Sequence, residues 1–232
     1  MTTWVNNMSA SVKIRVNQRL FLRDPQESKL GKKMIEQGIE LIDEIGIEKF
    51  TFKKLATKMD STEASIYRYF ENKHFFLVYL VSWYWEWVNF RIEFNSMNIE
   101  DPKRKLKITI KTIVDTIRLA TPVEYIDRDL LHRIVVKEGS KAYHINQVAE
   151  ENKMGFFSAY KSLSQKIASI IKAVNPTFPY PQTLASNLLE MANNHTYFAE
   201  HLPSLTDIKL KKGKMEPLED MLEYFVFKLI EA

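Results

Sequence analysis

Residues 51–73 read Thr51-Phe-Lys-Lys-Leu-Ala-Thr-Lys-Met-Asp-Ser-Thr-Glu-Ala-Ser-Ile-Tyr-Arg-Tyr-Phe-Glu-Asn-Lys73. Thr51 is a good helix N-cap, and apolar residues then recur at the spacing of one helix face, at Phe52, Leu55, Ala56 and Met59. Asp60 and Ser61 interrupt this pattern, and Thr62 can cap a further short helix that runs to about Phe70. Two short helices joined by a tight turn predict a helix-turn-helix.

The second of these short helices has two different faces. One face carries Ile66, Tyr69 and Phe70, and the opposite face, by i+3 and i+4 spacing, carries Glu63, Ala64, Tyr67 and Arg68. The apolar face predicts burial against the rest of the domain. Tyr67 and Arg68 therefore lie on a face that the core does not need.

A longer helix precedes this pair. Asp24, Pro25 and Glu27 supply an N-cap acceptor, a proline at the first helical position and a carboxylate at the third, so the helix is predicted to begin there. Apolar residues recur at helical spacing up to Ile45. Gly46 is expected to end the helix, because glycine adopts the left-handed conformation most readily.

The chain ahead of this helix, residues 1–23, is a basic arm with Lys13, Arg15, Arg19 and Arg23 and no acidic residue. These four cations equal the net charge of +4 of the whole chain. A basic arm ahead of a helix-turn-helix can enter the minor groove of DNA. The alternative is packing on the protein surface, because Val12, Ile14 and Val16 alternate with charges and Leu20-Phe21-Leu22 favours burial.

Every segment after Lys73 is predicted to be helical, which agrees with only 6 Gly and 8 Pro in 232 residues. The expected helices are Phe75–Phe94, Pro102 to about Ala120, Pro122 to about Glu138, about Ala142–Val174, about Gln182–His201 and about Pro217–Ile230. The sequence shows no internal repeat. We therefore expect three parts: the arm at 1–23, a three-helix domain at 24–73 and a helical bundle at 74–232.

The ending Tyr67-Arg-Tyr-Phe-Glu-Asn-Lys73, together with the Thr51 cap, the Leu55-Ala56 pair and the Thr62 to Ser65 spacing, resembles the DNA-binding domain of the TetR/AcrR family of bacterial transcriptional regulators. The resemblance covers roughly residues 27–80. It departs in the turn, where the family usually has glycine and then an apolar residue and this chain has Asp60 and Ser61. Aspartate tolerates the left-handed conformation, so we expect the turn to survive.

The resemblance implies an all-α protein, with an N-terminal three-helix helix-turn-helix DNA-binding domain and a C-terminal helical bundle for ligand binding and dimerisation. It places Thr62, Ala64 and Ser65 at the start of the recognition helix that faces the groove, and it gives contacts with the DNA backbone to Tyr67, Tyr69 and Lys73. Two alternatives stay open. Tyr69 can instead belong to the core, and Lys73 can cap free helix carbonyls.

The residues themselves also point to DNA. Lys53 and Lys54 lie in the first turn of their helix, where cations are disfavoured unless an anion such as phosphate is bound. Arg68 has the length and the planar fork to contact guanine or a phosphate, and Glu63 can accept from cytosine or merely compensate the helix dipole. The predicted DNA-binding residues are Thr51, Lys53, Lys54, Thr62, Glu63, Ala64, Ser65, Tyr67, Arg68, Tyr69 and Lys73.

The bundle is rich in aromatic side chains, which suit a pocket for a small apolar or aromatic effector. The predicted pocket consists of Trp83, Trp87, Phe90, His132, Phe157 and Tyr160, although aromatic residues at helical spacing also suit an ordinary core. The last two helices carry more apolar residues than one core needs. They predict a homodimer interface that includes Leu184, Leu188, Met191, Met221 and Phe225.

Several classes of protein are disfavoured. Zero cysteines exclude disulfide scaffolds and thiolate metal sites. There is no apolar signal segment, and the most apolar run, Phe75–Trp85, is shorter than the ~20 residues that span a bilayer, so a cytoplasmic protein without membrane contact is expected. Asp129 and His132, at i and i+3, can form a metal pair or a hydrogen-bonded pair, and no third ligand is identifiable.

No Ser/His/Asp set, carboxylate pair or glycine-rich phosphate loop supports an enzyme, and we expect neither a cofactor nor a bound metal. The favoured function is a ligand-responsive, sequence-specific transcriptional regulator. It is expected to act as a homodimeric repressor on a palindromic double-stranded DNA operator. The alternative is a helical module that binds other proteins and leaves the helix-turn-helix unused.

Overall fold

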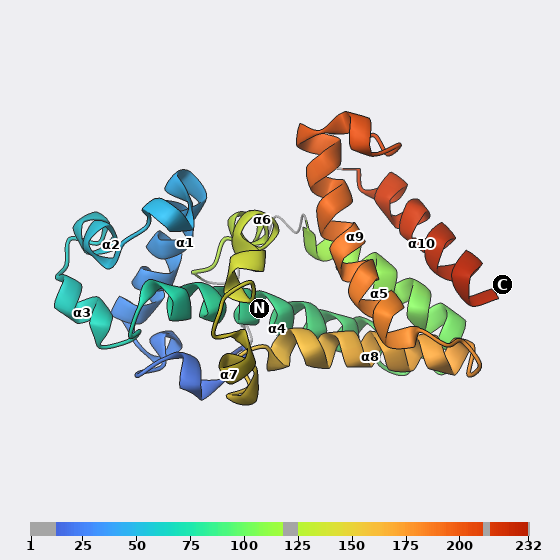
Figure 1. Ribbon diagram of the computed structural model, residues 1–232, viewed down its shortest axis with the longest axis horizontal. Coiled ribbons are helices and arrows are strands. Elements are labelled where there is room, and N and C mark those ends of the chain that lie inside the picture. Colours follow the sequence, from blue (N-terminus) through green and yellow to red (C-terminus); the bar gives the residue numbers. More distant parts are fainter. Residues whose placement is uncertain (1–12, 118–124, 211–213, 232) are drawn as a thin grey trace, which may run out of the picture.

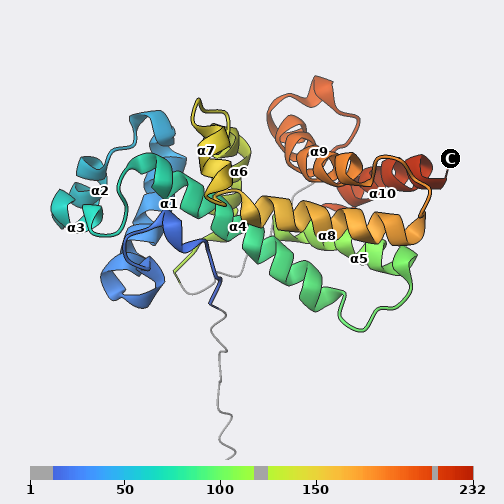
Figure 2. The same cartoon turned by 60° about the horizontal axis from the view of Figure 1, so that its bottom comes forward.

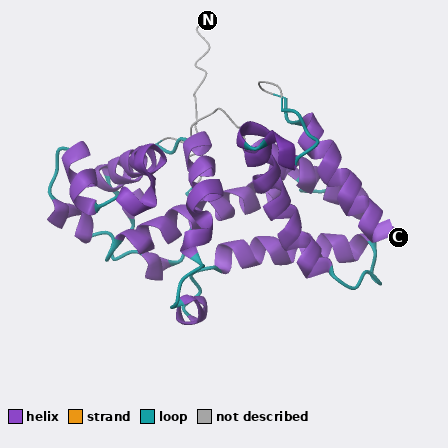
Figure 3. Ribbon diagram, turned by 45° about the horizontal axis from the view of Figure 1, so that its top comes forward, coloured by secondary structure: helices purple, strands orange, loops and turns teal. Residues whose placement is uncertain are grey.

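The computed structural model describes residues 13–117, 125–210 and 214–231, and these residues form helices without a β-strand (Figure 3). The expected all-α fold is confirmed. None of the described helices combines the length and the apolar character that crossing a bilayer requires. The α-helices are α1 (Lys29–Lys49), α2 (Phe52–Lys58), α3 (Glu63–Tyr67), α4 (Lys73–Asn95), α5 (Pro102–Ile117), α6 (Arg128–Glu138), α7 (Val148–Lys153), α8 (Ser158–Val174), α9 (Pro181–His201) and α10 (Glu216–Glu231).

Helix α4 connects the two ends of the elongated molecule (Figure 1). Helices α1, α2 and α3 gather at one end, and α5, α8, α9 and α10 form the bundle at the other. Helix α4 packs against α5, α6 and α8, and α8 packs in turn against α5 and α9. Figure 2 shows α8 and α5 running alongside α4. The core is therefore continuous from the recognition helix to the bundle.

A cluster of phenylalanine rings holds α4 against the three N-terminal helices. Phe76 is fully buried and stacks on Phe50 with ring centroids 5.6 Å apart, while Phe70 meets it edge-on at 5.0 Å. Gly38 of α1 gives this ring its space, because a Cβ at position 38 would lie 2.4 Å from Phe76 Cζ. The close approach of α1 to α4 thus depends on a glycine.

The first helix begins later than predicted. Asp24 caps a short 3₁₀ turn, Pro25–Glu27, and α1 begins at Lys29 with Ser28 as its N-cap. The turn folds back on the helix, so that a Cβ at Gly31 would lie 2.3 Å from the carbonyl oxygen of Pro25. Gly46 has the expected left-handed backbone, with φ of 74°, although one further turn follows it. A residue with positive φ breaks the regular helix there.

Three other predicted boundaries are wrong. The recognition helix α3 ends at Tyr67 rather than near Phe70, and α6 begins at Arg128, where Asp127 accepts hydrogen bonds from two backbone amides. Pro122, the predicted helix start, lies outside the described residues. The stretch 142–174 is broken into α7 and α8, because Gly155 takes a φ of 78° between them.

Candidate DNA-binding surface and effector cavity

Two threonine caps build the helix-turn-helix. Thr51 Oγ1 accepts from the Lys54 amide at 3.2 Å, and Thr62 Oγ1 accepts from the Ser65 amide at 3.3 Å, as predicted for the starts of α2 and α3. Asp60, in the turn between them, has a φ of 51°. The side chain of aspartate is one of the few that adopt this left-handed conformation readily, so the turn forms without the usual glycine.

The recognition helix presents part of its predicted face to solvent. Ala64, Tyr67 and Arg68 are exposed, and Arg68 Nη2 donates to Ser65 Oγ at 3.2 Å. Ser65 itself is buried, and its hydroxyl also bonds to Thr62 Oγ1 at 2.9 Å. Ser65 therefore orients Arg68 from within the protein, while the exposed residues form the surface that can meet DNA.

Tyr69 belongs to the core, which is the alternative that the sequence left open. Its ring is buried, its hydroxyl is 2.7 Å from Ser28 Oγ at the start of α1, and the guanidinium of Arg23 lies over the ring at 5.5 Å. Glu63 is half-buried in the first turn of α3, and Thr62 is exposed. Tyr69 thus holds α3 against α1.

The lysines of the surface differ in how their ammonium groups are used. Lys53 projects into solvent. Lys54 Nζ donates to the Lys49 carbonyl at 2.9 Å, and Lys73 Nζ donates to the Ile47 and Glu48 carbonyls at 3.0 and 3.1 Å. Both bonded lysines thereby satisfy carbonyls at the end of α1, where the kink at Gly46 interrupts regular helical bonding.

The described part of the basic arm, residues 13–23, packs on the protein. Ile14 and Leu20 are buried, and Lys13 Nζ forms ion pairs with Asp24 and Glu27 at 2.9 and 3.0 Å. Arg15 and Arg19 stay exposed beside this anchored segment. Val12 lies outside the described residues.

This arrangement is that of a helix-turn-helix DNA-binding protein, because a capped, partly exposed recognition helix with an exposed arginine is braced by two further helices. Residues 34–78 match the family described as "Bacterial regulatory proteins, tetR family". The resemblance stated from the sequence is thus confirmed for this part of the chain. A search of curated proteins gives no match.

Solved structures share the fold well beyond this domain. A transcriptional regulator from Rhodococcus sp. Rha1 is 14% identical with a TM-score of 0.63, over 90% of this chain and 97% of that one. AibR in complex with isovaleryl coenzyme A and operator DNA is 12% identical with a TM-score of 0.55, over 85% and 96%. The ketosteroid regulator KstR2 of Mycobacterium tuberculosis is 11% identical with a TM-score of 0.56, over 95% and 97%.

An apolar cavity of about 340 Å³ lies between α4, α7 and α8. Of the predicted pocket residues, Phe157 and Tyr160 line it, and Trp85 of α4 lines it in place of Trp83 or Trp87. The hydroxyl of Tyr160 donates to Glu190 Oε1 at 3.1 Å. The other lining residues are Val78, Val81, Ser82, Ala142, Tyr143, Val148, Ala149, Asn152, Phe156 and Lys161.

The remaining predicted pocket residues lie elsewhere. Trp83 and Trp87 are buried and stack on each other with centroids 6.1 Å apart, and Phe90 packs against Trp87. They line neither this cavity nor the polar one that contains His132. That second cavity, about 330 Å³ between α6 and α9, places His132 Nε2 3.3 Å from Asn193 Oδ1. Asp129 also lines it, and among the described residues no group of three acidic or histidine side chains could hold a metal.

The predicted dimer residues fall into two groups. Leu184 and Leu188 are buried within the single chain, where α9 packs against α8 and α10. Met191 and Met221 are half-buried, and Phe225 is 41% exposed. On α10 the side chains of Leu229, which also belongs to the predicted apolar surface, and of Tyr224, which the prediction did not name, are more exposed still.

Short helix α7 forms one wall of the apolar cavity and bonds to three other segments. The carboxylate of Glu151, which is buried, lies 2.9 and 3.0 Å from Nε2 of His74 in the first turn of α4. Asn152 Oδ1 accepts from Lys161 Nζ of α8 at 2.9 Å. Just after the helix, the Met154 carbonyl accepts from Asn17 of the arm at 3.1 Å. The cavity wall is therefore bonded directly to the DNA-binding end of the molecule.

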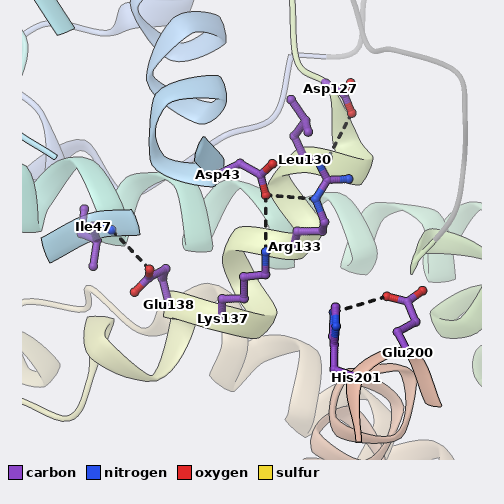
Figure 4. Close-up of polar contacts among 9 residues, drawn as sticks. All are labelled: Asp43, Ile47, Asp127, Leu130, Arg133, Lys137, Glu138, Glu200 and His201. Atoms are coloured by element: carbon purple, nitrogen blue, oxygen red, sulfur yellow. Dashed lines mark hydrogen bonds and ion pairs between the residues drawn. The ribbon is translucent and has the colours of Figure 1, made fainter. Parts of the chain in front are cut away.

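A second connection joins α1 to α6 (Figure 4). Arg133 donates from Nε and Nη2 to the two carboxylate oxygens of Asp43 at 2.9 and 2.8 Å, and Lys137 Nζ lies 3.9 Å from the same carboxylate. One turn further along, Glu138 Oε1 accepts from the Ile47 amide at 3.2 Å. The hydrogen bonds from the Arg133 guanidinium hold the pKa of Asp43 below its usual value.

The Asp43–Arg133 pair is expected to make stability depend on pH in the acid range. Because the pKa of Asp43 is lower in the folded than in the unfolded protein, the pair stabilises fully above the unfolded pKa of about 3.9. This stabilisation is lost as pH falls through the lower, folded pKa. Urea unfolding of the wild type and of Asp43→Asn, from pH 7 to 3, should show a difference in free energy that shrinks only below about pH 4. A difference that stays constant down to pH 3 would contradict the assignment.

Proposed function

We propose that this protein is a ligand-responsive transcriptional repressor that acts in the cytoplasm and binds a palindromic operator as a homodimer. The single observation that carries DNA binding is the tetR-family helix-turn-helix at residues 34–78, with Arg68 and Tyr67 exposed on its recognition helix. The fold shared with AibR, whose structure holds isovaleryl coenzyme A and operator DNA, supports pairing such a domain with a ligand-binding bundle.

We assign the effector to the apolar cavity between α4, α7 and α8. The observation in its favour is that its wall α7 touches the DNA-binding end through Glu151 and His74, and through the Met154 carbonyl and Asn17. A ligand that displaces α7 changes these contacts. It thereby shifts the spacing of two recognition helices, which must lie ~34–36 Å apart to enter successive major grooves.

The direct test is selection of duplexes from a random pool with the full-length protein, followed by titration of the selected duplex. We expect a palindromic consensus with two half-sites about one helical turn apart. Small apolar and aromatic compounds added to the complex should then release the DNA. Failure to enrich any sequence would favour the alternative, a helical module that binds proteins.

The homodimer is expected to form through α9 and α10, with Phe225, Tyr224 and Leu229 at its centre. These three side chains are 41%, 60% and 54% exposed in the single chain, although they are aromatic or aliphatic. Phe225→Glu should convert the dimer to a 27.3 kDa monomer, because a carboxylate would be buried without a partner. Light scattering at micromolar concentration measures this.

Phe94→Glu provides the control for this prediction. Phe94 is also an exposed aromatic residue, but it lies at the end of α4, a helix that packs against α5, α6 and α8. It should leave the oligomeric state unchanged. A wild-type protein that scatters as 27.3 kDa would remove the dimer from this proposal.

A further inference from the structure

Of the described residues that line the apolar cavity between α4, α7 and α8, one is charged, Lys161. The rest of the lining is mostly aliphatic and aromatic, with Val78 and Trp85 from α4 and Phe156 and Phe157 from just before α8, and it includes the neutral polar Asn152. The volume of about 340 Å³ lies at the lower end of the ~300–1,000 Å³ that ligand pockets occupy. The cavity therefore suits a small, mostly apolar body.

Lys161 has a neutral partner. Its Nζ donates to the amide oxygen of Asn152 at 2.9 Å, and no carboxylate of the described residues forms an ion pair with it. On the same helix, Lys166 is paired with Glu93 at 3.0 Å. Lys161 is solvent-exposed and lines the apolar cavity, so among the described residues its charge has no acidic partner at the solvent edge of this cavity. An anion whose apolar body enters the cavity can pair with it there.

Two acidic residues beside this cavity already have other partners. Glu190 does not line the cavity, and its Oε1 accepts the hydroxyl proton of Tyr160 at 3.1 Å. Glu151, although on α7, bonds to His74 on the side of α4. Neither carboxylate forms an ion pair with Lys161, so the cavity carries a positive charge at one point of a lining whose other described residues are uncharged.

We propose that the effector is a small amphipathic carboxylate, whose apolar body fills the cavity and whose carboxylate pairs with Lys161 in place of Asn152. This inference rests on the proposed function, because it assigns the ligand class of the proposed effector cavity. Exchange of an amide for a carboxylate partner adds a negative charge on the acceptor, so that a hydrogen bond from an ammonium to a neutral oxygen becomes an ion pair. It also releases Asn152, and with it α7, from α8.

The test compares three probes of equal length that differ only in the head group: octanoate, 1-octanol and octylamine. Calorimetric titration of the full-length protein without DNA should give octanoate the highest affinity, about tenfold above octanol, because only the carboxylate adds an opposite charge to the hydrogen bond from Lys161. Octylamine should bind weakest, because its ammonium meets Lys161. The pair 3-phenylpropanoate and 3-phenylpropan-1-ol repeats the comparison with an aromatic body.

Three variants test whether Lys161 causes the preference for octanoate over octanol. Lys161→Met keeps the apolar stem and should bring octanoate down to the affinity of octanol. Lys172→Met, a matched control on the exposed side of α8 that does not line the cavity, should preserve the tenfold difference. Asn152→Ala removes the neutral partner but keeps the charge, and it should also preserve the preference. Comparison of Lys161→Met with Asn152→Ala therefore separates the effect of losing the charge from the effect of losing the contact between α7 and α8.

Three results would overturn the proposal: equal affinities of octanoate and octanol for the wild type, a preference that survives Lys161→Met, or absence of binding by every probe. Failure of the proposed function has a different signature. In that case octanoate binds in a Lys161-dependent manner, while the affinity for the selected operator is unchanged by octanoate.

Discussion

Phe76→Ala is expected to destabilise the protein by about 3–5 kcal/mol, the range typical of buried phenylalanine truncations. Phe76 is fully buried at the start of α4, and its ring contacts those of Phe50, Phe52 and Phe70. Removal of the ring leaves a cavity where the three N-terminal helices meet α4, and Gly38 opposite has no side chain that could fill it. Chemical unfolding measures the loss.

Phe94→Ala is the matched control for this result. Phe94 lies on the same helix and is 62% exposed, so its truncation should change the free energy of unfolding by less than about 0.5 kcal/mol. Similar losses for the two variants would show that the aromatic cluster around Phe76 does not carry the stability of the domain.

Arg68→Ala is expected to cost about 1–3 kcal/mol in binding to the operator, if its guanidinium contacts a guanine in two places. Arg68 is exposed, and its bond to Ser65 Oγ, at 3.2 Å, orients it along the recognition helix. The loss should be much smaller on scrambled DNA, because a base contact exists only on the operator. Titrations against both duplexes measure the ratio of specific to non-specific affinity.

Lys53→Ala is expected to affect DNA binding in a different way from Arg68→Ala. The ammonium of Lys53 projects into solvent near the start of α2, whereas Lys54 is already bonded to the Lys49 carbonyl. A phosphate contact by Lys53 predicts equal weakening on both duplexes and a salt slope smaller by about 1. Arg104→Ala, exposed on α5 in the bundle, should change neither. Equal weakening of both duplexes by Arg68→Ala would instead make Arg68 a phosphate contact.

The sequence alone determined the local architecture of the DNA-binding end. The caps at Thr51 and Thr62, the left-handed Asp60 and the left-handed Gly46 were all predicted, because each depends on bonds and backbone angles within three or four residues. The predicted helix boundary was wrong where it depends on packing between elements. The α1 start moved from Pro25 to Lys29, because the preceding turn folds back on Gly31.

The position of the apolar cavity between α4, α7 and α8 was decided by the tertiary structure. Helix α4 is apolar on all sides, with Val78, Trp83, Trp85 and Trp87 all buried, so no periodic pattern tells which side meets α8 and which the interior of the bundle. The sequence therefore selected Trp83 and Trp87, and the fold placed Trp85 at the cavity.

The same reason explains the contacts that join the cavity to the DNA-binding end. His74 and Glu151 are 77 positions apart, and Asp43 and Arg133 are 90 apart. No local sequence pattern links residues at such separations. Glu151 of α7 meets His74 at the start of α4, and Arg133 of α6 meets Asp43 of α1, only in the folded protein. Helix caps and turns are determined by neighbouring residues. A cavity, and the hydrogen bonds that link its walls to other elements, form only when helices that are distant in the sequence pack together.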